Sequence, residues 1–513
     1  MKMKGKRGLC MMIKKQKKGD SHNFILKRIT MNAASAVGTW MKHISRSGKT
    51  QVCAGVAAVF LMLMSGTVPT YAEVSYMPDV TAEMNAPEFW LGLQPADADT
   101  VWADSAKIDM INAAILATPE TNTNDLLHYT EVTDGVKFNA SVLKSLREDF
   151  ESYQKKGYYD QYGNEISDAL IDYVVNNTQN QMASHNQSPI YAIVTKRTTL
   201  NEFPADITIT DERGDLNFNY NILSAVRVND PLIIKSVSAD GQWYYALSEN
   251  CEGWVNASDI ALCKNKSEWE SAWNIPKDRV LVVADGRIFL AESNTNPATS
   301  NLMLTMGTKL EIAPKGSYGT RVTNRSPIGN HVVYVPVRNW DGTYSKELAL
   351  ISAGANVHEG YIPLTKRNVL TVAFRMLGDT YGWGGMLSSN DCSGYIGDVY
   401  RCFGLNIPRN TTWQAASPSF GYDVTGFSDE QKLMILNNMP IGSVLFFKGH
   451  EMMYLGTYNG KYYVVSSMSS MAYYAGPGIM RTRSVMINTL DMRRANGSTW
   501  LSNLYKFQVP YMM

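Results

Sequence analysis

The chain has 513 residues, of which 45% are hydrophobic and 19% are charged. A chain of this length can bury several cores, and we expect three or four domains of roughly 100 to 200 residues each. The formal net charge of +1 includes a very basic N-terminal segment, so the remainder is slightly acidic. Because nucleic-acid binders usually carry a basic stripe, this distribution excludes nucleic acid as an expected partner.

The N-terminal region predicts an export signal. A segment rich in Lys and Arg, residues 1–50, leads into an apolar run from Val52 to Val68, and a small residue, Ala72, precedes Glu73. The run is shorter than the roughly 20 residues that a membrane span needs, and Ala72 suits a signal-peptidase cut. We therefore assign residues 1–72 to a basic leader and signal peptide and expect an extracytoplasmic protein, in the periplasm, the cell envelope or the medium. An uncleaved anchor is the alternative, and only then is the membrane a partner.

The cysteines do not predict a disulfide framework. Six occur, at positions 10, 53, 251, 263, 392 and 402, and the first two lie inside the segment that we expect to be removed. Cys251 and Cys263 form a bridge if their strands are neighbours, and the alternative is two small buried side chains. No cluster of Cys and His with zinc spacing occurs in the mature chain, so we expect no metal and no other cofactor.

Between the leader and the C-terminal region, the sequence has three parts that differ in their residue patterns. Residues 73–187 mix helical periodicity, as in SAKIDMINAAILA (105–117), with polar turns, which favours a mainly helical or clip-like N-terminal domain. Residues 188–264 contain short strands rich in β-branched and aromatic residues, such as DPLIIKSV (230–237), and predict a small barrel. Residues 275–362 show the same texture and predict a second barrel with longer loops.

The C-terminal region, residues 363–513, predicts a mixed domain. KRNVLTVAFRMLG (366–378) has apolar residues at helical spacing, and a second helix is expected in DCSGYIGDVYRCFG (391–404). Three strand-like segments follow, SVLFF (443–447), MMYLG (452–456) and YYVVS (462–466). A helix carrying a Cys against a short antiparallel sheet carrying a His is the layout of a papain-like site. The fold class is therefore α+β multidomain, with a papain-like catalytic domain after two small β-barrels and a mainly helical segment.

Cys392 and His450 are the candidate nucleophile and base. Asp391 is suited to cap the helix, which puts Cys392 in the first turn, where the helix dipole and free amides stabilise a thiolate. His450 is the only histidine downstream of that Cys, and its neighbours Gly449 and Glu451 favour a strand end over a packed interior. Together they suit thiolate attack and protonation of a leaving group. The alternatives are a buried Cys without chemistry and a core histidine.

The motifs around this pair resemble a known family. YGWGG (381–385), DCSG (391–394), IPRNTTWQA (407–415) and GHEMMYLG (449–456) are similar to the NlpC-type cell-wall endopeptidases, which are papain-like cysteine peptidases. The preceding barrels resemble the subgroup with two bacterial SH3-like domains before the enzyme. The resemblance implies cleavage of the bond between γ-D-glutamate and a diamino acid in peptidoglycan stem peptides, in wall turnover or recycling. Cys392 is then the nucleophile and His450 the base.

The resemblance also implies further site residues. Tyr381 is expected beside the Cys, where it helps to bind the reacting carbonyl, and core packing is the alternative. Asp391 and Ser393 are expected to contact the substrate backbone. The first barrel is expected to close one end of the cleft and to bind the free amino group of an N-terminal L-Ala. An acidic side chain and tyrosines suit an ammonium, so the candidates there are Glu202, Tyr244 and Tyr245.

The third catalytic position falls on Ser466, which is a departure from the family, where a His is common. A serine can hold the imidazole tautomer but supplies no charge to stabilise an imidazolium. A two-residue Asn459–Gly460 turn would place His450 and Ser466 on opposite faces of the sheet, so a bulge or a three-residue turn is needed. In a regular hairpin, Ser467 or Ser469 would share the face of His450.

Two other functions are alternatives to the peptidase function. One is a cell-wall-binding protein whose enzyme domain has weak or no activity, as the serine at the third position would allow. The other is a thiol acyltransferase on the same fold, because a thioacyl-enzyme can pass its acyl group to an amine as well as to water. In either case we expect a monomer that binds peptidoglycan stem peptides.

Overall fold

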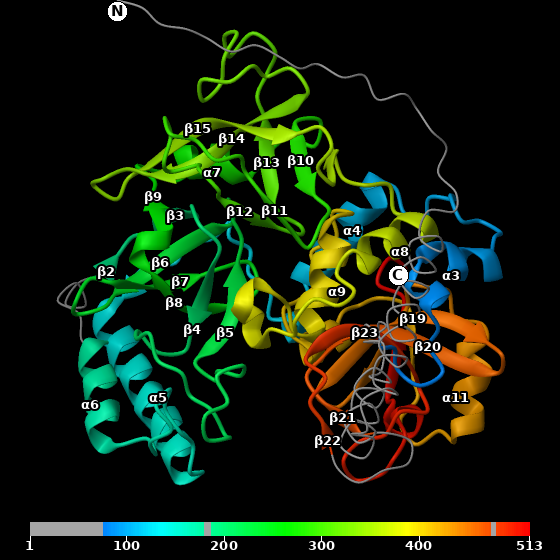
Figure 1. Cartoon of the computed structure of the whole chain (residues 1–513). Coiled ribbons are helices and arrows are strands. Elements are labelled where there is room, and N and C mark those ends of the chain that lie inside the picture. Colours follow the sequence, from blue (N-terminus) through cyan, green and yellow to red (C-terminus); the bar gives the residue numbers. More distant parts are fainter. Residues whose placement is uncertain (1–74, 179–185, 473–478) are drawn as a thin grey trace, which may run out of the picture. The chain divides into compact units, whose positions relative to one another are not determined.

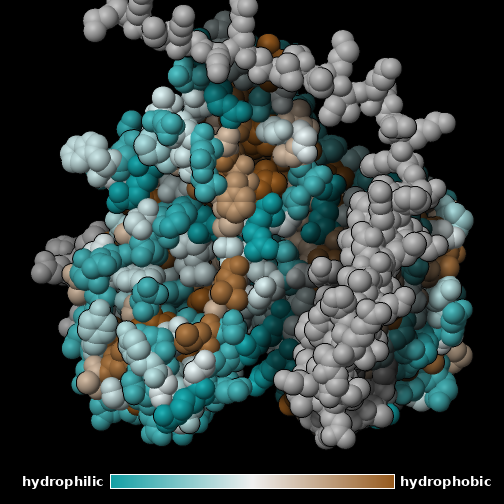
Figure 2. Space-filling model, in the orientation of Figure 1, coloured by the Kyte–Doolittle hydropathy of each residue, from teal (hydrophilic) through white to brown (hydrophobic). Residues whose placement is uncertain are grey.

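The computed structural model describes residues 75–178, 186–472 and 479–513. The predicted leader and signal peptide lie outside these residues. No helix within the described ranges has the length and apolar character needed to cross a membrane. Hydrophilic side chains predominate on the face shown in Figure 2, and the apolar ones there form separate patches.

The N-terminal helices contribute to two different cores. They are η1 (Ala82–Asn85), α3 (Pro87–Leu93), α4 (Ser105–Leu116), η2 (Pro119–Thr121), α5 (Gly135–Lys155) and α6 (Asp168–Asn177), and a short pair, β1 (Thr133–Asp134) and β2 (Asn186–Gln187), lies among them. The helix predicted from residue 105 is confirmed as α4. Trp90 and Ile111 belong to the core of the C-terminal domain, whereas Phe150 and Val174 pack with Phe203 beside the first sheet. The segment is thus helical, but its helices are divided between two cores.

The first β-rich region forms a seven-stranded sheet in the order β5-β4-β8-β7-β6-β3-β9 (Figure 1). Its strands are β3 (Ile190–Val194), β4 (Thr198–Asn201), β5 (Ile222–Val226), β6 (Pro231–Val237), β7 (Trp243–Leu247), β8 (Glu252–Asn256) and β9 (Ile260–Leu262), with η4 (Ala257–Asp259) before the last. Alternate apolar side chains from these strands form a core of their own, as expected for a small β domain. Cys251 and Cys263 are both free thiols, so the bridge does not form.

The second β-rich region forms a five-stranded sheet in the order β15-β14-β13-β10-β16, with a separate β11-β12 pair. The elements are α7 (Lys266–Trp273), β10 (Val280–Val283), β11 (Arg287–Phe289), β12 (Met303–Thr305), β13 (Lys309–Ile312), β14 (Asn330–Arg338), β15 (Tyr344–Ser352) and β16 (Val357–Glu359). Leu281, Val333 and Ile351 lie in its core.

The C-terminal region is the predicted mixture of helices around an antiparallel sheet, whose order is β17-β24-β18-β19-β20-β23. The helices are α8 (Lys366–Phe374), η5 (Trp383–Ser388), α9 (Cys392–Arg401), α10 (Thr411–Ala415), α11 (Asp429–Leu436) and α12 (Trp500–Asn503). The strands are β17 (Gly421–Asp423), β18 (Val444–Phe447), β19 (His450–Tyr458), β20 (Lys461–Met468), β23 (Ser484–Thr489) and β24 (Lys506–Gln508), and β21 (Met471–Ala472) pairs with β22 (Ile479–Met480) outside the sheet. Ile396 and Val399 pack α9 onto this sheet, so the helix that begins with the Cys lies against the strand that begins with the His.

Candidate active site

The start of α9 is fixed by Asp391. Its Oδ1 atom accepts a hydrogen bond from the amide of Gly394 at 2.8 Å, as predicted for an N-cap, and its Oδ2 atom accepts from the amide of Gly384 at 3.0 Å. Arg409 donates to Oδ2 at 2.7 Å. Burial alone would raise the pKa of Asp391, but the guanidinium of Arg409 and the two amide hydrogen bonds together outweigh burial and hold this pKa below its ordinary value. Asp391 is therefore a buried anion directly before Cys392.

Cys392 and His450 line one cavity of about 320 Å³. Tyr381 lines it too, and all three side chains are largely buried, with exposed fractions of 8%, 9% and 6%. The thiol of Cys392 lies 3.8 Å from the hydroxyl of Thr411. The two predicted catalytic side chains and the predicted carbonyl-binding tyrosine thus open onto the same space.

A β-bulge between β19 and β20 brings His450 to the side of Ser466. The strand register shifts by one residue between Tyr454 and Gly456, so that Leu455 is the extra residue. The Nε2 atom of His450 lies 3.1 Å from the Oγ atom of Ser466. Because Nε2 is engaged in this way, Nδ1 is the nitrogen left to accept a proton from the thiol.

Among the described residues, the hydrogen bond of the His450 side chain goes to Ser466 and not to either alternative serine. Ser467 points to the other side and donates to the backbone carbonyl of Asn390 at 2.7 Å. Ser469 lines the cavity at Cys392. The structure contains the bulge that is needed to bring His450 and Ser466 to the same face of the sheet, and the two side chains form a hydrogen bond.

Both candidate catalytic groups are uncharged at neutral pH. Burial, followed by the nearby carboxyl groups of Asp391 and Glu451, raises the pKa of Cys392 to about 12. Burial, followed by the charge of Arg494, lowers the pKa of His450 to about 3. The site therefore holds a thiol and a neutral imidazole, and formation of the ion pair depends on what a substrate adds or displaces.

The loop before α9 packs tightly onto β5. Gly384 and Gly385 have φ values of 59° and 93°, and a Cβ atom there would lie 2.6 Å from Ile222 and 2.5 Å from Ala225. Only glycine meets both conditions. These contacts place Tyr381, three residues earlier, at the cavity, so the Gly-Gly pair acts through packing.

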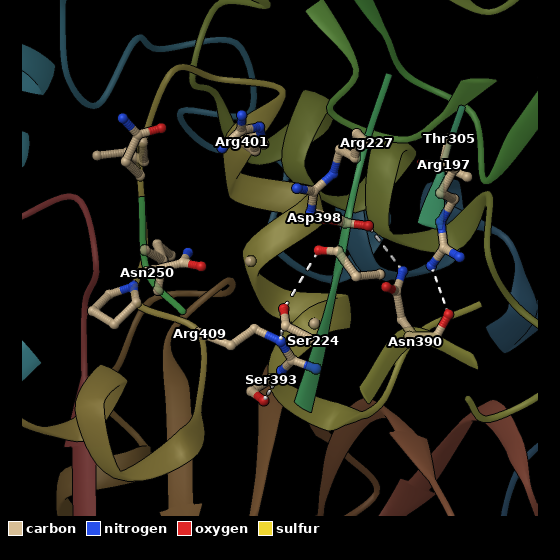
Figure 3. Close-up of a pocket in the computed structure, with 18 residues that line it drawn as sticks. Arg197, Ser224, Arg227, Asn250, Thr305, Asn390, Ser393, Asp398, Arg401 and Arg409 are labelled. Carbon is tan, nitrogen blue, oxygen red and sulfur yellow. Dashed lines mark hydrogen bonds and ion pairs between the residues drawn. The ribbon is translucent and has the colours of Figure 1, made fainter. Parts of the chain in front are cut away.

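A second, smaller cavity of about 50 Å³ lies between α9 and the first sheet and is lined by four arginines (Figure 3). Arg227 pairs with Asp398, and Arg401 donates to Asp230 at 2.9 Å. Arg401 also donates to Glu249 at 3.0 Å. Arg409 donates to Asp391 at 2.7 Å. The remaining arginine, Arg197, donates to the carbonyls of Gly385 and Ser389. Since three of the four guanidinium groups pair with four carboxylates, this cluster is an ionic contact between two regions of the fold.

Comparisons with known proteins identify both regions. Residues 378–508 match the model of the NlpC/P60 family, and residues 209–256 match an SH3 domain of the SH3b1 type. The chain carries an NlpC/P60 domain. The predicted α+β fold, with an SH3-like region before a papain-like domain, is thereby confirmed. No curated protein matches the chain.

Two solved structures are similar to this chain, and the first of them shares its fold. An NlpC/P60 endopeptidase from Photobacterium damselae subsp. piscicida has a TM-score of 0.63 and 18% identity, covering 81% of this chain and 95% of its own. An NlpC/P60 family protein from Bacillus cereus ATCC 10987 has a TM-score of 0.41 and 15% identity, covering 63% of this chain and 99% of its own. The first comparison extends the similarity beyond the NlpC/P60 domain to most of the described chain.

Several predicted substrate-binding residues lie away from the cavity at Cys392. Ser393 lines the arginine cavity, where its hydroxyl donates to Asp391 at 3.2 Å. Glu202 and Tyr245 line a separate cavity of about 430 Å³ between α5 and the first sheet, and Glu202 accepts a hydrogen bond from Tyr153 at 2.9 Å. Tyr244 packs against the core of that sheet. The structure does not bring these four side chains to the NlpC/P60 cavity.

Sequence reasoning missed two features of the site. Lys448, Arg493 and Arg494 line the cavity at Cys392, and the residues that line it within the described ranges include no carboxylate. Glu451 is completely buried; the strand end predicted at His450 is confirmed, since β19 begins there, but the expectation that it lies outside a packed interior was wrong. The arginines follow β23 in the sequence and gave no motif, and a single Glu in an apolar strand gave no signal of burial. Within the same described ranges, no group of three or more His, Cys, Asp or Glu could hold a metal ion.

Proposed function

We propose that the protein is an extracytoplasmic cysteine peptidase that hydrolyses the γ-D-glutamyl–diamino acid bond of peptidoglycan stem peptides. The observation that carries this proposal is the cavity that Cys392, His450 and Tyr381 share, with His450 held by Ser466. The NlpC/P60 fold supports the peptidase class, and the SH3 domain supports binding to wall material.

The charge of the cavity supports the choice of substrate. A γ-linked glutamate keeps its α-carboxylate free beside the bond that is cut, and diaminopimelate carries further carboxylates. Lys448, Arg493 and Arg494 line the cavity and supply positive charge near the Cys. Guanidinium groups bind carboxylates through paired hydrogen bonds, so this lining suits an anionic peptide better than a neutral one.

The proposed reaction runs through a thioacyl-enzyme. The Sγ atom of Cys392 attacks the γ-carbonyl carbon while its proton passes to Nδ1 of His450. Burial and the neighbouring Cys392 raise the pKa of Tyr381 well above its ordinary value, so its hydroxyl stays a donor to the carbonyl oxygen. Collapse of the tetrahedral intermediate expels the diamino acid, whose nitrogen takes the proton from His450. Water, deprotonated by His450, then attacks the thioester and releases the acid and the thiol.

The experiment is mass spectrometry of L-Ala-γ-D-Glu-diaminopimelate incubated with the mature protein and with Cys392→Ala. We expect release of L-Ala-D-Glu by the wild type only. A copy with the α-carboxylate of D-Glu amidated should be cut more slowly, because the basic lining loses its partner. No cleavage of any copy would refute the peptidase proposal, and transfer of the dipeptide to an added amine would assign an acyltransferase.

The requirement for a free N-terminal L-Ala is part of the proposal and has its own control. An N-acetylated tripeptide should be spared if the amine is recognised. Because Glu202 lies in another cavity, Glu202→Gln should leave cleavage of the free peptide unchanged. Loss of cleavage in this variant would mean that Glu202 reaches the substrate after all.

The uncharged state of the catalytic pair favours a second candidate, a wall-binding protein with weak catalysis. A thiol whose pKa is raised to about 12 reacts slowly unless a substrate changes its surroundings. Binding of the wild type and Cys392→Ala to purified peptidoglycan, with no products in either case, would support this candidate.

A further inference from the structure

Glu451 is a buried carboxyl group that the proposed reaction does not use. It is the second residue of β19, next to His450, and its exposed fraction is 0%. Neither of its carboxyl oxygens has a hydrogen-bond partner of regular geometry within the described ranges. Native proteins pair nearly all buried polar groups, so an exception in contact with a candidate active site requires an explanation.

The surroundings of Glu451 connect it to the nucleophile. The hydroxyl of Thr411 lies 3.8 Å from the thiol of Cys392, and this hydroxyl lowers the pKa of both Cys392 and Glu451. The backbone of Glu451 also lies near enough to the thiol to lower the pKa of Cys392. Thr411 is therefore a neighbour that the thiol and the buried carboxyl group have in common.

The titratable groups that face this pair come from three segments. Asp391 lies at the start of α9, Arg409 precedes α10, and Tyr505 precedes β24. Arg409 is already bound to Asp391 at 2.7 Å, and the next cation along the chain, Lys506, donates to the carbonyl of Ala415. No cation is thus left to neutralise a second anion beside Asp391 within this described cluster.

The protonation state of Glu451 follows from this balance. Burial, followed by the negative charge of Asp391, raises the pKa of Glu451 well above its ordinary value. Burial and the same anion act on Cys392 in the same direction. When two such groups interact strongly, the first proton leaves the pair as a unit, and the second leaves only at a much higher pH.

We propose that Glu451 and Cys392 form a coupled pair that carries at most one negative charge, so that Glu451 must keep its proton for the thiolate to form. Glu451 is a positioning residue in this scheme, because it acts through Cys392 and does not touch the substrate. The inference rests on the proposed function, since it assigns to Cys392 the role of nucleophile.

The test is the pH dependence of alkylation of Cys392 by iodoacetamide, followed by mass spectrometry of the peptide that contains it. Thiolate in the wild type should appear in two steps with a plateau between them, because the first proton lost is shared with Glu451. Glu451→Gln removes the competing acid, so its profile should show one step and a rate at the plateau pH about threefold higher or more. The exposed Glu430→Gln is the matched control and should reproduce the wild-type profile.

The outcomes are decisive without a peptide substrate, so failure of this inference is separate from failure of the peptidase assay. A single step in the wild type, or superimposed profiles of the wild type and Glu451→Gln, would overturn the coupled pair. Circular dichroism establishes that each variant is folded. If the Gln variant does not fold, Glu451→Met, which is close in volume and equally uncharged, should give the single-step profile instead.

Discussion

At the scale of single residues, Ser466 is the proposed catalytic residue whose side chain is least suited to the role. It is fully buried, with an exposed fraction of 0%, and its hydroxyl lies 3.1 Å from Nε2 of His450. A neutral hydroxyl fixes the orientation and tautomer of the ring but adds no charge to stabilise an imidazolium. The positive Arg494 acts against protonation of His450 as well. Ser466 therefore contributes by orientation.

This role predicts a moderate effect of Ser466→Ala. We expect kcat to fall about tenfold with KM nearly unchanged, since loss of an orienting hydrogen bond to a functional His costs roughly 10- to 100-fold. Ser467→Ala is the matched control, because Ser467 faces the other side of the same strand and contacts Asn390. Steady-state kinetics on the tripeptide measures both variants. Equal losses of kcat in the two variants would show that the strand as a whole, and not the Ser466 hydroxyl, supports His450.

At the scale of elements, the hairpin of β19 and β20 shows what the sequence could and could not predict. Both strands and the Asn459–Gly460 turn were predicted from apolar runs and turn chemistry, and the register conflict between His450 and Ser466 followed from simple counting. The position of the bulge did not follow, because many sites along a strand can accept one extra residue. Packing of the whole sheet decides among them.

The surroundings of Glu451 and Glu202 could not be predicted from the sequence for the same physical reason. Glu451 is a single acidic residue before an apolar run, which suits a solvent-facing position, but α9 packs against β19 and Glu451 is fully buried. Likewise, the acidic side chain of Glu202 suits an ammonium group, yet in the structure it accepts a hydrogen bond from Tyr153 of α5. Residue type predicts chemistry, whereas burial and partners depend on contacts distant in the sequence.

The bulge itself yields a prediction at Gly456. Its φ of 109° lies where side chains are rarely found, although a Cβ atom there would meet nothing closer than 3.5 Å. Gly456→Ala should therefore cost about 1–3 kcal/mol in backbone strain. If the variant relieves the strain by moving the bulge, His450 also leaves Ser466, and kcat should fall along with stability.

Gly460→Ala provides the comparison for this variant. Gly460 has a φ of 74° in the turn of the same hairpin, so the substitution is also strained, but it lies beyond the bulge. We expect it to lower the free energy of unfolding and to leave kcat nearly unchanged. Denaturant unfolding and kinetics on both variants separate strain from register, and equal kcat values would contradict a role for the bulge in placing His450.

At the scale of the whole described molecule, buried ion pairs join the SH3-like sheet to the NlpC/P60 domain. Arg401, near the end of α9, donates to Asp230 at 2.9 Å and to Glu249 at 3.0 Å, and both acids belong to the SH3-like region. The exposed fraction of the Arg401 side chain is 8%. Buried pairs of this kind add little net stability compared with apolar packing, but removal of one partner leaves the others charged and unpaired.

Arg401→Met should accordingly destabilise the protein by about 3–5 kcal/mol, because Asp230 and Glu249 lose a shared cation in a buried place. The substitution weakens the contact between two regions, each of which has a core of its own. We therefore expect differential scanning calorimetry to show one unfolding transition in the wild type and two in the variant. Arg367→Met is the matched control, since Arg367 pairs with Asp99 where both side chains are exposed, and such pairs contribute about 0–1 kcal/mol. A single transition in Arg401→Met at nearly the wild-type temperature would mean that apolar packing alone joins the SH3-like sheet to the peptidase domain.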